Sequence, residues 1–455
     1  MARWFTKNAK MIGVGRQTDI STANAWAISA SDYHVFAAEI EVVEGQYQAA
    51  EWAAARAQGG AKMAPVPGRR GATFSLRMPL QALKTGSYVL ATDGPGAANL
   101  SLSPQALLLA NALGSAAGAP TALQFLQGSH LSASAYIAPG GTGVVGATTT
   151  VITAPSPGTD ATFLGGQFAA CAASNTDTTP QFGWVKSQVD GGATNDITLY
   201  EASQQTAAAG DSLMGTATAY MSSNQQIPLT FRVFGPNSAG TELLTGCYCV
   251  GGEIDLKFGD EPWVKLDFIA ADFSRVTGAS QIVPATGTWY ICPTAKSANN
   301  GRFTYGASGT GSASSVQGWK DLKIVWKTPI ERIESAAGIQ GWGTPGLSFP
   351  DVTVTASIAY DSADTIGAGG DHTLVDDFVA GNKVSICWSS GIVAGRIVSV
   401  FLPSLHHNKC PVPKGSGEAG MLYHEIELVP DEYIGDTTGA RASTAVNSLF
   451  RIGYA

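Results

Sequence analysis

Apolar and polar residues alternate along two neighbouring runs inside the strand-rich stretch Ser212–Phe273. Charged residues occupy every second position of both runs, and apolar residues occupy most of the positions between them. The charged positions are Glu253, Asp255, Lys257, Lys265 and Asp267. A period of two places successive side chains on opposite faces of a strand, and the Gly-Asp-Glu-Pro between the runs favours a turn. The pattern therefore predicts an antiparallel hairpin with one apolar face and one charged face.

Three more segments alternate in the same way and are predicted to be strands. They are Gly71–Leu80, Asp351–Tyr360 and Gly420–Val429. Two short segments break the pattern and predict helices, Ser103–Gly114 and Thr373–Gly381. The first begins with an N-cap serine, has proline at the first helical position and ends in glycine. In the second helix, we expect Asp376 and Asp377 to be exposed.

The long segment of residues 114–210 is rich in Gly, Ala, Ser and Thr. We interpret it as long hairpins and loops, because these residues favour turns. Its strand candidates are Ala135–Ala138, Thr148–Ile152 and Ile197–Glu201. The chain as a whole is predicted to be all-β, with one or two short helices.

The second half of the chain repeats the order of elements in the first half: strand, helix, strand pair and closing strand. Closing strands with acidic positions are Trp263–Ile269 in the first half and Gly420–Val429 in the second. The predicted division is a first domain over residues 1–275, a linker or insertion over 276–320 and a second domain over 321–455. A single large sandwich with insertions would show a similar pattern, so both interpretations stay open.

Composition narrows the class of protein. Only 14% of the residues are charged, and the formal net charge is −8. The absence of a basic patch argues against tight binding of nucleic acid through its phosphates. Few charges also fit a surface that neighbouring subunits cover. The N-terminal residues lack the apolar core of a signal peptide, and no apolar run is long enough to span a membrane. We therefore expect a protein with no membrane association and with reduced cysteines, folded in a cytoplasm.

Catalytic and metal-binding motifs are not recognised. His406, His407 and Cys410 form the most metal-like group, but they have no partner pair at useful spacing, and nearby prolines predict a loop. The Cys247-x-Cys249 pair is too closely spaced for a zinc knuckle. There is no nucleophile elbow and no phosphate-binding loop. We predict no enzyme activity, no cofactor and no metal, although scattered tryptophans leave a carbohydrate-binding or glycoside-cleaving β protein as an alternative.

Four features together resemble the tail tube proteins of long-tailed bacteriophages, and together they span most of the chain. In chain order they are the short strand Ile12–Thr18, the strand Gly71–Leu80 leading to the helix Ala106–Gly114, the segment Leu244–Val250 leading into Glu253–Phe258 and Trp263–Ala270, and the C-terminal Asn447–Ile452. Their joint order carries the resemblance. Residues 115–200 and 276–320 exceed what a minimal tube domain needs, which leaves room for a surface domain or stacking loops.

The resemblance implies a structural protein of the virion tail, assembled in the host cytoplasm. Its tube domain is a β-sandwich or barrel, duplicated in this chain, and inner strands of neighbouring subunits join around a lumen. Two tube domains in each chain would give trimeric, pseudo-sixfold rings, and one would give hexameric rings. The implied partners are further copies of the chain, other tail proteins, and genomic DNA that passes through the lumen without specific binding. Another virion β-sandwich protein, such as a capsid-decorating, distal tail or spike protein, is the main alternative.

The carboxylates of the predicted inner strands are the residues that we expect to face the lumen. They are Glu253, Asp255, Asp267, Glu425 and Glu427. An acidic or polar lining lets a polyanion slide without sticking, because it offers no cations to the phosphates. The alternative is that these residues belong to ordinary solvated strand faces.

Overall fold

The structure is a computed structural model of the whole chain. It describes part of the 455 residues. The described residues are 9–16, 34–40, 44–50, 66–84, 104–114, 136–137, 144, 146–155, 166, 168–173, 178, 180–190, 192–215, 217–221, 226, 228–234, 241–276, 289–291, 301–308, 314–316, 318–339, 341–360, 374–393, 396–416, 421–431 and 448–455.

Strands dominate these residues, as the sequence predicts. The largest sheet contains β1 (Ala9–Arg16), β2 (His34–Ile40), β3 (Glu44–Ala50), β4 (Val66–Pro79), β13 (Ala217–Tyr220), β14 (Leu229–Phe234), β15 (Thr241–Lys257), β16 (Trp263–Ala270), β17 (Asp272–Val276), β19 (Gly301–Ala307), β20 (Ser314–Ser315), β21 (Trp319–Lys327), β25 (Asp351–Ala359), β26 (Val384–Ser390), β27 (Val398–His407), β28 (Val412–Ser416), β29 (Met421–Pro430) and β30 (Arg451–Tyr454). The described helices are α1 (Pro104–Ala112) and α3 (Leu374–Ala380). The prediction of an all-β fold with short helices is confirmed.

The smaller sheets lie beside this main sheet. One has the strand order β6 (Tyr136–Ile137), β12 (Ser212–Gly215), β9 (Phe168–Ala172), β10 (Gln181–Asp190), β11 (Thr194–Leu199), β8 (Val151–Pro155) and β7 (Gly146–Ala147). Two short pairs are β5 (Gln81–Lys84) with β18 (Trp289–Ile291), and β22 (Ile330–Glu331) with β24 (Gly346–Leu347). The strand β23 (Glu334–Ile339) follows β22, and a single bridge joins its first residue to Trp342.

Six strands close into a barrel, in the order β1–β14–β15–β16–β4–β2 and back to β1. Phe231 on β14 lies edge-on to Phe74 on β4, with ring centroids 5.2 Å apart. Because these two strands do not pair, the rings meet across the barrel interior. Phe268 on β16 completes the cluster, with its ring 5.0 Å from Phe231 and stacked on Phe74. The apolar side chains of the alternating runs therefore fill the barrel, as their period of two predicts.

The helix α1 follows β4 and packs its apolar residues into the same core. Pro104 is its first residue, as expected, since proline lacks the N–H that a first helical residue leaves unused. Gly114 ends the helical segment with a φ of 74°, in the left-handed region that glycine adopts without a steric penalty. The expected N-cap, Ser103, lies outside the described residues.

The strand β15 is long enough to join two units. Residues 241–247 of β15 pair with β14 in the barrel. Residues 251–257 pair with β21 along the same edge of β15. A continuous sheet then runs β4–β16–β15–β21–β25–β29–β28. It connects the barrel with strands from the second half of the chain. The predicted linker also contributes a strand, since β19 pairs along β26.

The second unit is a half-barrel whose strand order repeats that of the first. The order β25–β29–β27–β26 corresponds to β4–β16–β15–β14, and a helix follows the first strand in each unit. The fourth strand of each order pairs with one more strand: β26 pairs with β19 in the second unit, and β14 pairs with β1 in the first. The predicted order of strand, helix, strand pair and closing strand is therefore present in both halves as a shared connectivity.

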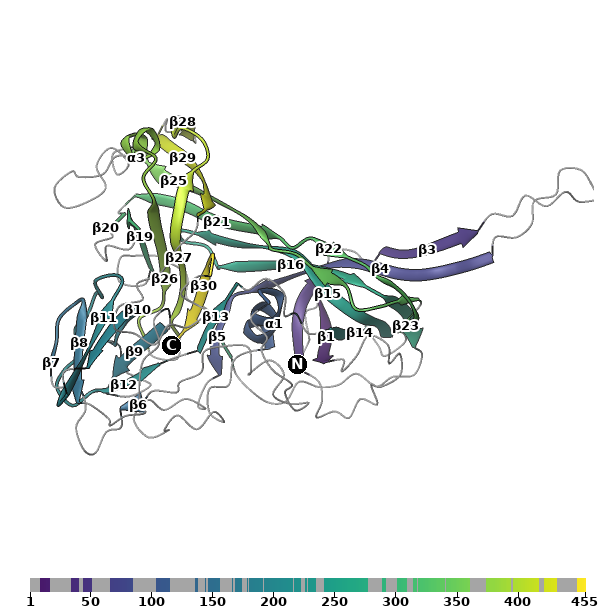
Figure 1. Cartoon of the computed structure of the whole chain (residues 1–455), viewed down its shortest axis with the longest axis horizontal. Helices are drawn as coiled ribbons and strands as arrows, with labels where there is room; N and C mark the ends of the chain where they lie inside the picture. The colour runs from purple at the N-terminus through teal and green to yellow at the C-terminus, as the bar shows by residue number, and fades with distance from the viewer. Residues whose placement is uncertain are drawn as a thin grey trace, which may run out of the picture.

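The strands β26, β27 and β30 form a middle layer that is covered on both faces. On β27, Val400 and Leu402 point into the main core, whereas Phe401 points into a separate cluster with Phe168 and Trp184 of the seven-stranded sheet. The indole N–H of Trp184 donates to Ser399 Oγ over 2.9 Å. The seven-stranded sheet therefore packs on the far side of this layer, at the lower left of Figure 1.

The seven-stranded sheet corrects the interpretation of residues 114–210 as long hairpins and loops. It has its own core, which includes Ile152, Val185 and Ile197. Three of its strands, β7, β9 and β10, were not among the predicted strands. The strand β9 has the sequence Phe-Ala-Ala-Cys-Ala and is buried on both faces, so it shows no alternation of apolar and polar residues.

Candidate functional site

The five predicted carboxylates lie on one face of the continuous sheet. Residues directly opposite each other on paired strands share a face, so the register places them. Glu425 on β29 lies opposite Ser357, which lies opposite Asp321, which lies opposite Lys257 on β15. The next row along the strands contains Glu427 and Asp255, connected through Thr355 and Lys323. Carboxylates from both halves of the chain therefore share one surface.

Two further rows complete this surface. Glu253 lies opposite Lys265, which lies opposite Arg77, which lies opposite Glu39. Asp267 lies opposite Ser75, whose hydroxyl donates to its carboxylate. The opposite face of the same strands is apolar, and Ile254, Leu266 and Ile324 are fully buried there.

We call this surface the charged face, and it contains both signs of charge. Its carboxylates are those of Glu39, Glu253, Asp255, Asp267, Asp321, Asp351, Glu425 and Glu427. Its cations are Arg77, Lys257, Lys265, Lys323, Lys327, Lys409 and Lys414. The two sets nearly cancel, so the face is mixed rather than acidic.

Several cations of the charged face are paired with its carboxylates. Lys323 Nζ lies 2.7 Å from Glu253 Oε1, and Lys257 Nζ lies 3.0 Å from Asp255 Oδ2. The hydrogen bond and the charge of Asp255 raise the pKa of Lys257. Arg77 lies 3.8 Å from Glu39 and stacks over the Trp263 ring at 4.7 Å. These pairs are partly exposed, so each contributes only about 0.2–1 kcal/mol to stability.

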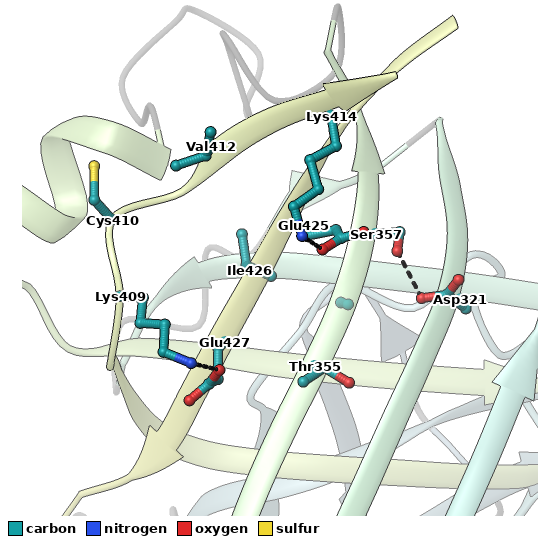
Figure 2. Close-up of a pocket in the computed structure, with 11 residues that line it drawn as sticks. Asp321, Thr355, Ser357, Lys409, Cys410, Val412, Lys414, Glu425, Ile426 and Glu427 are labelled. Atoms are coloured by element: carbon teal, nitrogen blue, oxygen red, sulfur yellow. Dashed lines mark hydrogen bonds and ion pairs between the residues drawn. The ribbon is translucent and has the colours of Figure 1, made fainter. Parts of the chain in front are cut away.

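A hollow of about 570 Å³ lies where β28 and the turn before it overhang the face (Figure 2). Lys414 pairs with Glu425 across it. Lys409 Nζ lies 2.5 Å from Glu427 Oε2, and the Asn408 amide donates to Glu427 Oε1 over 2.6 Å. These hydrogen bonds lower the pKa of Glu427. Figure 2 shows both lysine side chains extended toward the carboxylates of β29.

A smaller hollow lies on the same face at the β15–β16 hairpin. Its volume is about 220 Å³, and it is lined by Arg77, Glu253, Asp255, Trp263 and Lys265. The alternating hairpin pattern already placed Lys257 and Lys265 beside the carboxylates, but Arg77, Lys323, Lys409 and Lys414 were not predicted on this face. The alternation of Lys323 with apolar residues in 319–328 is the signal that was available, because it places lysine on a charged strand face.

A buried polar network joins β19, α3 and the end of β27 in the second unit. The Tyr305 hydroxyl donates to Asp377 Oδ2 over 2.9 Å and lies 2.9 Å from His407 Nε2. Asn382 Nδ2 donates to Asp377 Oδ1 over 2.9 Å. The expected exposure of both α3 aspartates is wrong for Asp377, which is 2% exposed because it accepts these bonds. Burial lowers the pKa of His407 to about 4.

The metal-like group of the sequence is spread apart by the fold. His407 ends β27 and is buried beside Tyr305, His406 points toward Asp431, and Cys410 is exposed in the following turn. The predicted loop is therefore partly strand. Among the described residues, no three His, Cys, Asp or Glu side chains are grouped to hold a metal ion. No helix in the described ranges is long and apolar enough to cross a membrane.

The described cysteines are free thiols. Cys247 and Cys249 point into the main core, as their i and i+2 positions predict, and burial raises the pKa of both thiols, that of Cys249 to about 12. These thiols are thus protonated and unreactive at neutral pH.

The fold defines an all-β protein in which a closed barrel and a half-barrel share one sheet with a charged face. No protein-family model matches the chain, and no curated protein matches it.

Proposed function

We propose that the chain is a tail tube subunit that forms stacked rings around a DNA-conducting lumen. The observation that carries the proposal is the charged face on the continuous sheet. Both units of the chain contribute strands to it, and both contribute the carboxylates that the sequence analysis assigns to the lumen. An extended polar sheet face with an apolar core behind it is the lining that a channel for a polyanion needs.

The shared connectivity of the two units supports a duplicated tube domain. The order β4–β16–β15–β14 and the order β25–β29–β27–β26 are the same, although the two halves show negligible sequence identity. With two tube domains in each chain, three chains form a pseudo-sixfold ring. The β15–β21 pairing then corresponds to the junction between two neighbouring domains of the ring.

The open edges of the sheet support association between copies. Among the described strands, β28 is hydrogen-bonded on one edge only, to β29. At the opposite end of the sheet, the β3–β4 hairpin projects far from the body of the molecule (Figure 1). Among the described strands, β3 is hydrogen-bonded on one edge, to β4. Open edges favour pairing with other chains, and closure into a ring removes them. We infer that the sheet continues from one copy to the next.

The layers of the fold are consistent with a charged face that points toward the lumen. The seven-stranded sheet packs on the layer of β26, β27 and β30, and the main core separates that layer from the charged face. If the charged face lines the lumen, the seven-stranded sheet lies on the outer surface of the tube. It then accounts for the extra length of residues 115–200 as a surface domain.

Electron microscopy of the purified protein tests the proposal. We expect rings or tubes of constant diameter, and a mass of three chains in each ring. Six chains in a ring would keep the tube and overturn the duplication. Compact trimers that do not polymerise would instead support a capsid-decorating, distal tail or spike protein. Strictly monomeric behaviour at high concentration would contradict the proposal.

A further inference from the structure

Lysines at the β28 end of the charged face are held by carboxylates of the same face. Lys409 and Lys414 come from the turn before β28 and from β28 itself, and they extend back over β29 (Figure 2). There Lys409 pairs with Glu427 over 2.5 Å, and Lys414 pairs with Glu425. Asn408 holds the second oxygen of Glu427. Both lysine side chains remain exposed, at 69% for Lys409 and 61% for Lys414.

This arrangement differs from an acidic lining. A purely acidic surface repels nucleic acid, and a surface with free lysines binds it by releasing counterions from the phosphates. Here each lysine already has a carboxylate as its counterion, so an approaching phosphate must compete with that carboxylate. Exchange of one anion for another releases few ions into solution. The expected result is contact with nucleic acid that is weak and depends little on salt.

We propose that the charged face is a masked binding surface for double-stranded nucleic acid, in which Glu425 and Glu427 keep Lys414 and Lys409 from the phosphates. The inference rests on the proposed function for its setting, since it explains how DNA can pass a wall that contains lysines. The masking itself is a property of the single chain. It can therefore be measured on unassembled protein.

The test compares binding of a short double-stranded DNA by the full chain and by the Glu425→Gln/Glu427→Gln variant. Fluorescence anisotropy is measured from about 50 to 200 mM salt, at protein concentrations where sedimentation shows no assembly. The variant frees two lysines, so the slope of log K against log salt should steepen by roughly 2. At the low-salt end, its affinity should rise at least about tenfold, which corresponds to about 1.4 kcal/mol.

Two controls make the result specific. Asp196→Asn/Asp211→Asn, which changes one residue on β11 and one just before β12, produces the same change in net charge away from the charged face and should leave binding weak. Adding Lys409→Gln/Lys414→Gln to the glutamine variant should abolish the gain. Equal DNA binding by Glu425→Gln/Glu427→Gln and by Asp196→Asn/Asp211→Asn would overturn the masking. A gain in affinity that persists without the two lysines would also overturn it. Because the measurement needs no rings, failure of the tube proposal leaves its outcome unaffected.

Discussion

The ring of Trp326 on β21 lies directly against the backbone of Gly252 on β15. The two residues are cross-strand partners, and a Cβ at position 252 would lie 2.4 Å from the ring. The carbonyl oxygen of Lys265 would lie 2.8 Å away on the other side. Trp326 is fully buried, with its ring 5.7 Å from that of Phe450. The glycine thus allows the large ring to fold over β15 at the point where the barrel and the half-barrel join.

Replacement of this glycine should weaken the junction. We expect Gly252→Ala to lower the free energy of unfolding by about 1–3 kcal/mol, because the added methyl group forces Trp326 or the backbone to move. Urea unfolding measures the change. Gly415→Ala on β28, where nothing lies within 4 Å of the added Cβ, should cost much less. Equal stability of Gly252→Ala and the native chain would show that the ring is free to move.

Charge reversal on the charged face should leave the fold intact. In Glu253→Lys/Asp255→Lys, the pairs with Lys323 and Lys257 are lost, but both carboxylate side chains are partly exposed. We expect soluble protein that has lost about 2 kcal/mol or less. Circular dichroism and thermal unfolding check this, with Glu253→Gln/Asp255→Asn as the control. If the proposed function holds, assembly continues and DNA passage is impaired. Failure to fold would mean that the carboxylates are structural.

Acid should destabilise the protein through His407. Its pKa is lowered to about 4 in the fold, mainly by burial, whereas the unfolded chain titrates near 6.5. The charged and titratable groups around it are Asp377, His406 and Tyr305. Between these two pH values the unfolded state binds more protons, so the free energy of unfolding falls as the pH drops from about 6.5 to about 4.

The His407→Gln variant separates this effect from other acid sensitivity. Glutamine can still donate to the Tyr305 oxygen, but it does not titrate. Unfolding free energies measured from pH 4 to pH 7 should fall less steeply in this variant, by an amount on the order of 2 kcal/mol over the range. Parallel curves for the native chain and His407→Gln would contradict the assignment.

The alternating strands were predictable because one of their faces is buried and the other is polar. The hairpin of β15 and β16 and the strand pair of β25 and β29 carry this signal directly in the sequence. Their placement on one sheet was not predictable, because it depends on β15 pairing with β21 across the predicted linker. Lys323 was missed as part of the charged face for the same reason. Lys323 lies far in sequence from Glu253 and meets it only through that pairing.

Buried segments were the hardest to predict. The strand β9 is covered on both faces, so polar and apolar residues do not alternate along it in a way that identifies an exposed side. The strands β26 and β27 are also buried, but they were predicted as the strand pair of the second half. Asp377 was expected on the surface because a carboxylate in a short helix is usually solvated. Its burial depends on Tyr305, which belongs to a strand inside the predicted linker.

Thiol reactivity should follow burial. Cys410 is exposed, whereas Cys171, Cys247, Cys249 and Cys387 are buried. Burial raises the pKa of Cys387 as it does that of Cys247. We expect iodoacetamide under native conditions to modify Cys410 well before these four residues, as read by peptide mass spectrometry, and Cys410→Ser to remove that product. Early modification of Cys247 would mean that the barrel opens easily.

The contact between the seven-stranded sheet and the half-barrel contains a buried carboxylate, Glu201. It accepts a hydrogen bond from Thr304 Oγ1 over 2.6 Å, and Arg302, which donates to the Ala202 carbonyl, supplies a nearby positive charge. Burial raises the pKa of Glu201, and Arg302 partly opposes that shift. The folded state thus holds the proton more tightly than the unfolded state. This group therefore makes the protein less stable as the pH rises through the raised pKa.

Removing the cation and removing the carboxylate should then have opposite effects at pH 8. We expect Arg302→Gln to lower the free energy of unfolding, because it removes the positive charge that partly offsets the buried carboxylate and the hydrogen bond to the Ala202 carbonyl. Glu201→Gln should be neutral or stabilising, since the amide oxygen still accepts from Thr304. Urea unfolding measures both, with Lys186→Gln on β10 as a control for loss of a cation. A larger loss in Glu201→Gln than in Arg302→Gln would show that the carboxylate itself helps to hold the two sheets together.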